Sequence, residues 1–237
     1  MLSAQSNTIP AFVGRDLYWK DMAAVDASVV RAMVTSQVVL AAVYCHKMGH
    51  TFTNPDPEGS FVSNLLLMMR FVDKATGKPR SEHVECIERL FLIYADHEMS
   101  NATAAMLHAA STRADPISCI VAALSAGYGT LHGGALDVAY SMLRKVGSPQ
   151  GVPSLIAAVK DRKTILYGFG HRIYKARDPR ARMFRDALSE IQRDEASDPL
   201  LAVAEEIDRT ASQDSFFTSR GVRINADFYA CFTYTTL

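Results

Sequence analysis

Apolar residues follow helical spacing through most of the chain. Residues 26–44 are almost all apolar or small and include no turn residue, so they predict a helix that ends at Gly49. Apolar side chains also recur at every third or fourth position within 83–112, which predicts further helix there. Ser60 and the pair Asp115-Pro116 are typical of helix starts. The first half of the chain is therefore predicted to be helical.

The second half continues this pattern. Further helices are predicted over 135–145 and 152–161, and after the Asp-Pro pairs at 178–179 and 198–199. Strand signals are confined to Thr164–Tyr167 and Phe216–Thr218. With so few strand candidates, the predicted fold class is all-α.

Composition and charge exclude several classes of protein. The 237 residues carry 25 Lys+Arg and 25 Asp+Glu, and this balance argues against a nucleic-acid partner held by bulk phosphate attraction. Four cysteines without CxxC spacing argue against a zinc knuckle or a disulfide framework and favour a reducing, intracellular compartment. Neither an apolar run of membrane-spanning length nor a leader segment is expected, and cytoplasm and mitochondrion are not distinguished.

Two glycine clusters, each holding one histidine, indicate a site rather than regular structure. Gly127–Gly134 contains four glycines and His132. The second cluster, Gly168-Phe-Gly-His171-Arg172, is followed by Lys175, Arg177 and Arg180. Glycine lets a ligand approach backbone N–H groups, and clustered cations recognise carboxylate or phosphate. These clusters predict a site for an anionic small molecule, with the histidines as proton donors.

Two acidic segments have a structural and a functional interpretation. Asp96-His97-Glu98 interrupts an apolar stretch, either as a solvent-facing part of a helix or as part of the site. Asp227 lies among aromatic residues, either as a helix N-cap or as a buried base with a raised pKa. The pair His46 and His50 has metal-ligand spacing but no nearby carboxylate, so a metal site is disfavoured. Phosphate-loop and dinucleotide-binding signatures do not occur.

Taken together, these segments resemble the citrate synthase family. The matching stretches, in order, are Tyr94-Ala-Asp-His-Glu-Met-Ser-Asn-Ala-Thr103, Ala110-Ser-Thr-Arg-Ala-Asp-Pro-Ile-Ser118, Gly129-Thr-Leu-His-Gly-Gly-Ala135, Gly168-Phe-Gly-His-Arg-Ile-Tyr-Lys-Ala-Arg-Asp-Pro-Arg-Ala181 and Asn225-Ala-Asp-Phe-Tyr229. The glycine-histidine segment that begins at Gly168 is the most specific of them. The resemblance implies a condensation of an acyl-CoA with oxaloacetate, followed by hydrolysis of the thioester.

The resemblance also implies a role for each matching site residue. Asp227 would remove a proton from the carbon next to the thioester, His132 would hydrogen-bond the enolate oxygen, and His171 would hydrogen-bond the ketone of oxaloacetate. His97 and Arg180 would hold oxaloacetate carboxylates. The residues expected along CoA are Gly168, Gly170, Arg172 and Lys175. The thioester is a substrate, and neither a metal nor another cofactor is expected.

The family architecture implies two domains and a homodimer. Residues 1–133 would form part of the large helical domain, and residues 134–237 would form the small domain with the CoA and catalytic segments. The chain ends ten residues after Asp227, before the family's further oxaloacetate arginines. This leaves a second interpretation open: a truncated, catalytically weak relative that binds CoA or oxaloacetate, or pairs with a full-length partner.

Two departures from the common pattern concern the acyl group. Tyr94 stands where many citrate synthases have a further histidine, as is also seen in methylcitrate synthase-like relatives. Leu136-Asp137 replaces the common Asn-Glu after His-Gly-Gly-Ala, which makes the acyl site less polar. The resemblance therefore extends to the alkylcitrate synthases of fungal secondary metabolism, and acyl groups longer than acetyl are expected.

Overall fold

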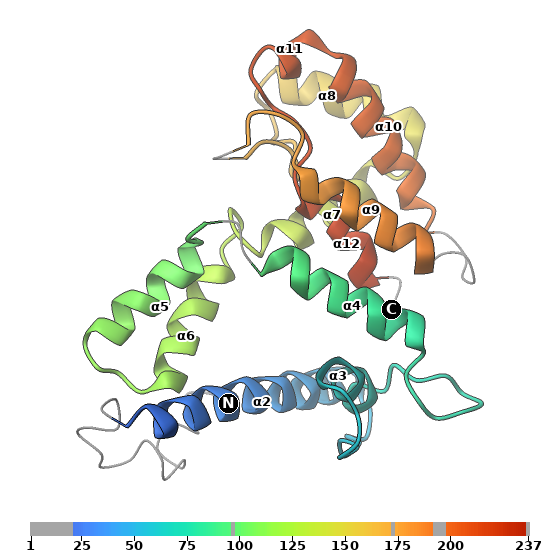
Figure 1. Cartoon of the computed structure of the whole chain (residues 1–237). Helices are drawn as coiled ribbons and strands as arrows, with labels where there is room; N and C mark the ends of the chain where they lie inside the picture. Colours follow the sequence, from blue (N-terminus) through green and yellow to red (C-terminus); the bar gives the residue numbers. More distant parts are fainter. Residues whose placement is uncertain (1–20, 96–97, 172–173, 192–197, 236–237) are drawn as a thin grey trace. The chain divides into compact units, whose positions relative to one another are not determined.

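The computed structural model describes residues 21–95, 98–171, 174–191 and 198–235, and these form helices joined by loops and turns (Figure 1). Within these ranges no strand forms, and one isolated antiparallel bridge joins Phe169 to Ile224. The all-α prediction is confirmed. Both strand predictions are wrong: Thr164–Tyr167 is a loop, and Phe216–Thr218 lies in a one-turn helix that Asp214 caps.

The chain divides into two compact units, one of Met1–Val84 with Asp96–Tyr128 and one of Glu85–Ala95 with Gly129–Leu237. In the first unit lie α2 (Met22–Met48), α3 (Phe61–Met68), the first turn of α4 (Ser81–Tyr94), α5 (Asn101–Ser111) and α6 (Pro116–Gly127). Helix α2 packs against α3 and α6, and α5 packs against α6 (Figure 1). The predicted boundary at 133/134 concerns the family's large and small domains and stays a prediction.

Capping residues begin and end these helices as the sequence predicts. Ser60 and Asp115 accept hydrogen bonds from backbone N–H groups three residues on, at 3.2 and 3.0 Å. Gly49 ends α2 with φ +69°, a conformation that glycine adopts without cost. The predicted helix over 83–112 is instead two helices, α4 and α5. Between them Glu98 has φ +73°, and Ser100 caps α5.

Helix α2 is, by length and composition, able to cross a membrane, so the expectation that no segment reaches that length is wrong. A core helix of a soluble protein meets the same criterion. The buried residues of α2 include the polar Ser28 and Gln37. The Gln37 amide donates to the backbone carbonyl of Phe61 at the start of α3. This part-buried hydrogen bond fits a helix that packs against protein.

The second unit is built around its last helix. It contains most of α4, then α7 (Ala135–Val146), the 3-10 turn η2 (Pro149–Gly151), α8 (Val152–Lys160), α9 (Pro179–Ile191), α10 (Leu200–Gln213), α11 (Ser215–Thr218) and α12 (Asp227–Thr235). Helix α12 packs against α7, α9 and α10. Its residues Phe228, Tyr229, Ala230 and Phe232 are fully buried. The N-terminus of α12, which begins with Asp227, is therefore fixed within the core of this unit.

Candidate active site

The glycine cluster at 168–171 runs antiparallel to the segment that leads into α12. The N–H of Gly170 donates to the Arg223 carbonyl at 2.7 Å, and the N–H of Asn225 donates to the Gly168 carbonyl at 2.9 Å. The Asn225 amide also donates to the Gly170 carbonyl at 2.9 Å. Through its Oδ1, Asn225 accepts the N–H of Asp227 at 3.0 Å. The glycine cluster and Asp227 are therefore held together by Asn225 and its neighbours.

Glycine is required at 168 for two reasons. Its φ is +81°, and a Cβ placed there would lie 2.5 Å from Cδ2 and 3.1 Å from Cα of Phe228. Gly170 has φ +84° but no atom within 4 Å of a Cβ position. The close approach of Gly168 to Phe228 brings the cluster against the residue that follows Asp227.

The carboxyl of Asp227 is largely buried at the N-terminus of α12. Burial raises its pKa, while Arg180 and a hydrogen bond from Tyr94 act in the opposite direction. The Tyr94 hydroxyl is 3.5 Å from Asp227 Oδ1. A nearby His132 also lowers the pKa of Asp227. A carboxylate with a raised pKa is a stronger base than an exposed aspartate.

His132 lies in the turn that precedes α7. Its backbone N–H donates to the Gly129 carbonyl at 2.9 Å, and its carbonyl accepts from Ala135 at 2.9 Å. The two glycines that follow His132 add no side chain to this turn. The turn brings the His132 imidazole within electrostatic range of Asp227.

The hydrogen bonding of His171 assigns its tautomer. Its Nδ1 accepts the backbone N–H of Tyr174 at 3.2 Å, and the two rings lie 4.8 Å apart. In a neutral imidazole with Nδ1 as acceptor, the proton is on Nε2. That Nε2 lies 3.5 Å from Arg180 Nη2. In this tautomer the contact is not a hydrogen bond, because a guanidinium can only donate, and the Nε2–H remains a donor for another molecule.

Arg180 is held by a buried carboxylate. Asp178, 1% exposed, accepts from Arg180 Nε at 3.1 Å and from Nη2 at 2.7 Å. Its Oδ2 also accepts the N–H of Ala226 at 3.2 Å. Burial alone would raise the pKa of Asp178, but the Arg180 and backbone hydrogen bonds lower it. Two of the five guanidinium N–H groups are pointed at Asp178, and the others can bind a carboxylate of another molecule.

The structure therefore brings together most of the predicted site residues within the second unit: His132, Gly168, Gly170, His171, Arg180 and Asp227. Lys175 joins them, since its Nζ lies 3.5 Å from the His171 carbonyl. The predicted residues His97 and Arg172 lie outside the described residues. Among the described residues no group of three His, Cys, Asp or Glu side chains is placed to hold a metal ion.

Sequence reasoning missed the role of Asp178, which it interpreted only as a helix cap. The residue does cap α9, since it accepts the Arg180 N–H at 3.0 Å. Its contact with Ala226 joins residues 48 positions apart, and no local pattern indicates such a contact. The available signal was Arg180, two residues on, because a buried guanidinium needs a carboxylate nearby.

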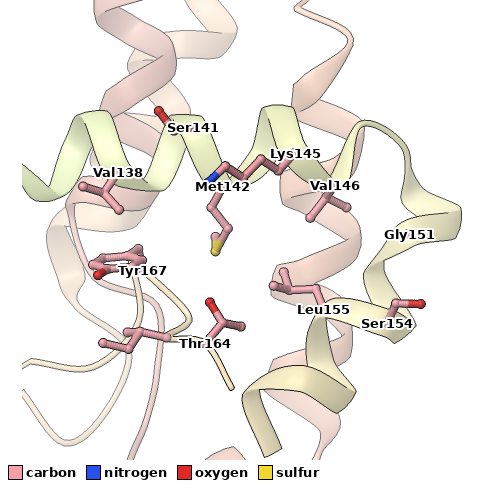
Figure 2. A pocket seen from close by; sticks show the side chains of 11 residues that line it. Val138, Ser141, Met142, Lys145, Val146, Gly151, Ser154, Leu155, Thr164 and Tyr167 are labelled. Atoms are coloured by element: carbon pink, nitrogen blue, oxygen red, sulfur yellow. The ribbon is translucent and has the colours of Figure 1, made fainter. Parts of the chain in front are cut away.

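A cavity of about 470 Å³ opens in the same unit between α7, α8 and the loop before Gly168 (Figure 2). Its apolar wall includes Val138, Met142 and Leu155, and the Tyr167 ring closes one side. None of the predicted site residues lines it. The cavity is therefore separate from the group of residues around Asp227.

The helical fold is that of the citrate synthases, and the chain belongs to the citrate synthase family. The family model described as "Citrate synthase, C-terminal domain" matches residues 2–237. The citrate synthase-like protein oryE of Aspergillus oryzae is 47% identical over 99% of this chain and 53% of its own length. The alkylcitrate synthase phiJ of a fungal species is 37% identical over 98% of this chain and 51% of its own length.

The solved structures agree with this assignment. The citrate synthase of Thermoplasma acidophilum, in a ternary complex with carboxymethyl coenzyme A and oxaloacetate, superposes with a TM-score of 0.81. It is 27% identical, and the match covers 99% of this chain and 59% of that one. The chain spans about half the length of the curated relatives it matches.

Proposed function

We propose that the protein condenses an acyl-CoA with oxaloacetate and hydrolyses the resulting thioester, giving a citrate or an alkylcitrate. The observation that carries the proposal is the convergence of a base, two imidazoles and a guanidinium at the N-terminus of α12. These groups are Asp227, His132, His171 and Arg180. Membership of the citrate synthase family supports assigning these groups to carbon–carbon bond formation next to a thioester.

Asp227 is the base that removes a proton from the α-carbon of the acyl-CoA. Carbon acids of this kind are very weak, so the enolate must be stabilised as it forms. His132 donates a hydrogen bond to the enolate oxygen, and one such preorganised donor typically contributes about 2.7–4 kcal/mol. The raised pKa of Asp227 supports this role because it narrows the difference in basicity between carboxylate and enolate.

His171 and Arg180 prepare oxaloacetate for attack. The Nε2–H of His171 donates to the ketone oxygen and makes the carbonyl carbon a better electrophile. Arg180 binds one carboxylate with the N–H groups that Asp178 does not use, and His97 binds another. The enolate carbon then attacks the ketone, and water cleaves the thioester of the condensed product to release CoA.

The glycine cluster lies along CoA in this proposal. Gly168 and Gly170 expose backbone without side chains, and the cations Arg172 and Lys175 bind anionic groups of the CoA thioester. The chemistry uses the CoA thioester as a substrate and requires neither a metal nor a redox group. A homodimer is part of the proposal by analogy with the family. The four free, buried cysteines fit an intracellular compartment.

We further propose an acyl group longer than acetyl. Leu136 gives the helix that follows His132 an apolar side chain, and Tyr94 carries an aromatic ring to Asp227. Similarity to proteins named alkylcitrate synthases supports this choice and a place in secondary metabolism.

The test is CoA release by the purified 237-residue chain, with its folding checked by circular dichroism. Oxaloacetate is supplied with acetyl-, hexanoyl-, octanoyl- or decanoyl-CoA, and Asp227→Asn is the matched control of nearly equal volume. Oxaloacetate-dependent release that Asp227→Asn abolishes is expected, with a longer acyl chain preferred. Equal or faster turnover of acetyl-CoA would refute the alkyl preference. If a folded sample released no CoA, the proposal that the chain is an enzyme would be refuted. The second interpretation, a catalytically weak relative that binds CoA or oxaloacetate, would then be tested by calorimetry with both ligands.

A further inference from the structure

A second buried carboxylate, Asp208 on α10, has hydrogen-bond partners that are not among the reacting groups of the site. Asp208 is 8% exposed. Its Oδ2 accepts the Tyr229 hydroxyl at 3.1 Å and Arg177 Nη2 at 2.8 Å. Both partners come from other elements, Tyr229 from α12 and Arg177 from the loop before α9. One carboxylate oxygen thus joins three segments of the second unit.

These contacts bracket Asp227 on both sides. Ala226, the residue before it, is fixed by Asp178, and Tyr229, two residues after it, is fixed by Asp208. Arg177 and Asp178 are neighbours in the chain, so the two anchors are joined to each other. Tyr229 is fully buried, and the guanidinium of Arg185 lies 5.7 Å from its ring centroid. The first turn of α12 is therefore held against both translation along the helix axis and rotation around that axis.

We propose that Asp208 is a positioning residue that sets the place of the Asp227 carboxylate for proton abstraction. The inference rests on the proposed function. If position 208 served packing alone, an apolar side chain would be more favourable there, because a buried charge is costly to desolvate. A directed carboxylate is needed where a hydroxyl and a guanidinium must be held at fixed points, and small misplacement of a base can cost about a hundredfold in rate.

The kinetic test compares Asp208→Asn and Tyr229→Phe with the unaltered chain. We expect kcat to fall about ten- to a hundredfold in Asp208→Asn. The KM for oxaloacetate should change less than kcat, because Asp178 still holds Arg180 directly. The isotope effect with acyl-CoA deuterated at the α-carbon should rise, since proton transfer becomes slower than the other steps. Tyr229→Phe should change kcat in the same direction by a smaller factor, and the double variant should lose less than the product of the two.

The matched control is Asp214→Asn. Asp214 is also a partly buried acid at the end of α10, where it caps α11 and pairs with Lys160. Its variant should lose stability without a change in the isotope effect. An unchanged kcat in Asp208→Asn, or a loss of kcat without a larger isotope effect, would overturn the proposal.

A second measurement does not depend on turnover, so it separates this proposal from failure of the proposed function. Amide hydrogen exchange of Asp208→Asn, followed by mass spectrometry of its peptides, should be faster over 223–230. The peptides of α7 and α8 should keep their protection. Uniformly faster exchange would show that Asp208 merely supports the fold, and unchanged exchange at 223–230 would show that it does not hold α12.

Discussion

Replacing Asp178 by asparagine tests how the site holds its cation. The side chain of Asp178 is fully buried and that of Arg180 is 11% exposed, so this ion pair is shielded from water. Asparagine keeps the shape of the side chain but removes its charge. The substitution also replaces one acceptor oxygen by a donor that faces either the guanidinium or the Ala226 N–H.

The magnitude follows from burial. Removing one partner of a buried ion pair typically costs about 3–5 kcal/mol, because the remaining charge is left uncompensated. For a chain of this size that loss lowers the Tm by about 6–20 °C. Since Asp178 has a lowered pKa in the folded protein, its contribution is complete above the unfolded value of 3.8. The contribution is lost as pH falls through the folded pKa.

Urea unfolding between neutral and acidic pH measures both effects. The difference in free energy of unfolding between the unaltered chain and Asp178→Asn should be constant near neutrality and should narrow below pH 3.8. Asp161→Asn is the control, because its ion pair with Lys163 is exposed on both sides and its loss should hardly change stability. A difference below about 1 kcal/mol, or one that does not change with pH, would refute the argument for a buried pair.

Three further predictions concern backbone strain, pH dependence and thiol reactivity. For Gly170→Ala the expected loss of stability is about 1–2 kcal/mol of backbone strain. Gly168→Ala should lose more, because its methyl group would also clash with Phe228; equal losses in urea unfolding would contradict the contact. Tyr94→Phe should move the acid limb of kcat to higher pH, because its hydroxyl lowers the pKa of Asp227; a limb that does not move in a pH–rate profile would count against the hydrogen bond. The four buried cysteines, two of them with pKa values raised to about 11 and about 12, should react with a thiol reagent only as the chain unfolds, and rapid labelling of the native protein would refute this.

Local chemistry made most helix ends predictable. Ser60, Asp115 and Gly49 act through contacts within a few residues, so their effect can be inferred from sequence alone. The break between α4 and α5 could not, because apolar spacing continues through it and the interruption depends on the positive φ of Glu98. Phe216–Thr218 has strand-forming residues, but Asp214 caps them into a helical turn.

The site divides in the same way. Its histidines, glycines and Asp227 lie in distinctive short segments, and these could be found from sequence. The acids that hold them could not, since Asp178 reaches Ala226 and Asp208 reaches Tyr229 only after α9, α10 and α12 have packed. Residues that carry chemistry leave a local signature, whereas residues that orient them are defined by tertiary contacts.

The bridge between Phe169 and Ile224 has a consequence for how this sequence can vary in evolution. The bridge and the backbone bonds beside it fix which residue of 168–170 faces which residue of 223–225. A single insertion or deletion on either side would shift the register by one residue and turn the Asn225 side chain away from Gly170. The residues between these two paired segments, 168–170 and 223–225, are not subject to this constraint on register. In descendants of this gene, insertions and deletions should therefore fall in loops between the helices of the intervening segment. The paired segments 168–170 and 223–225 should keep a constant length.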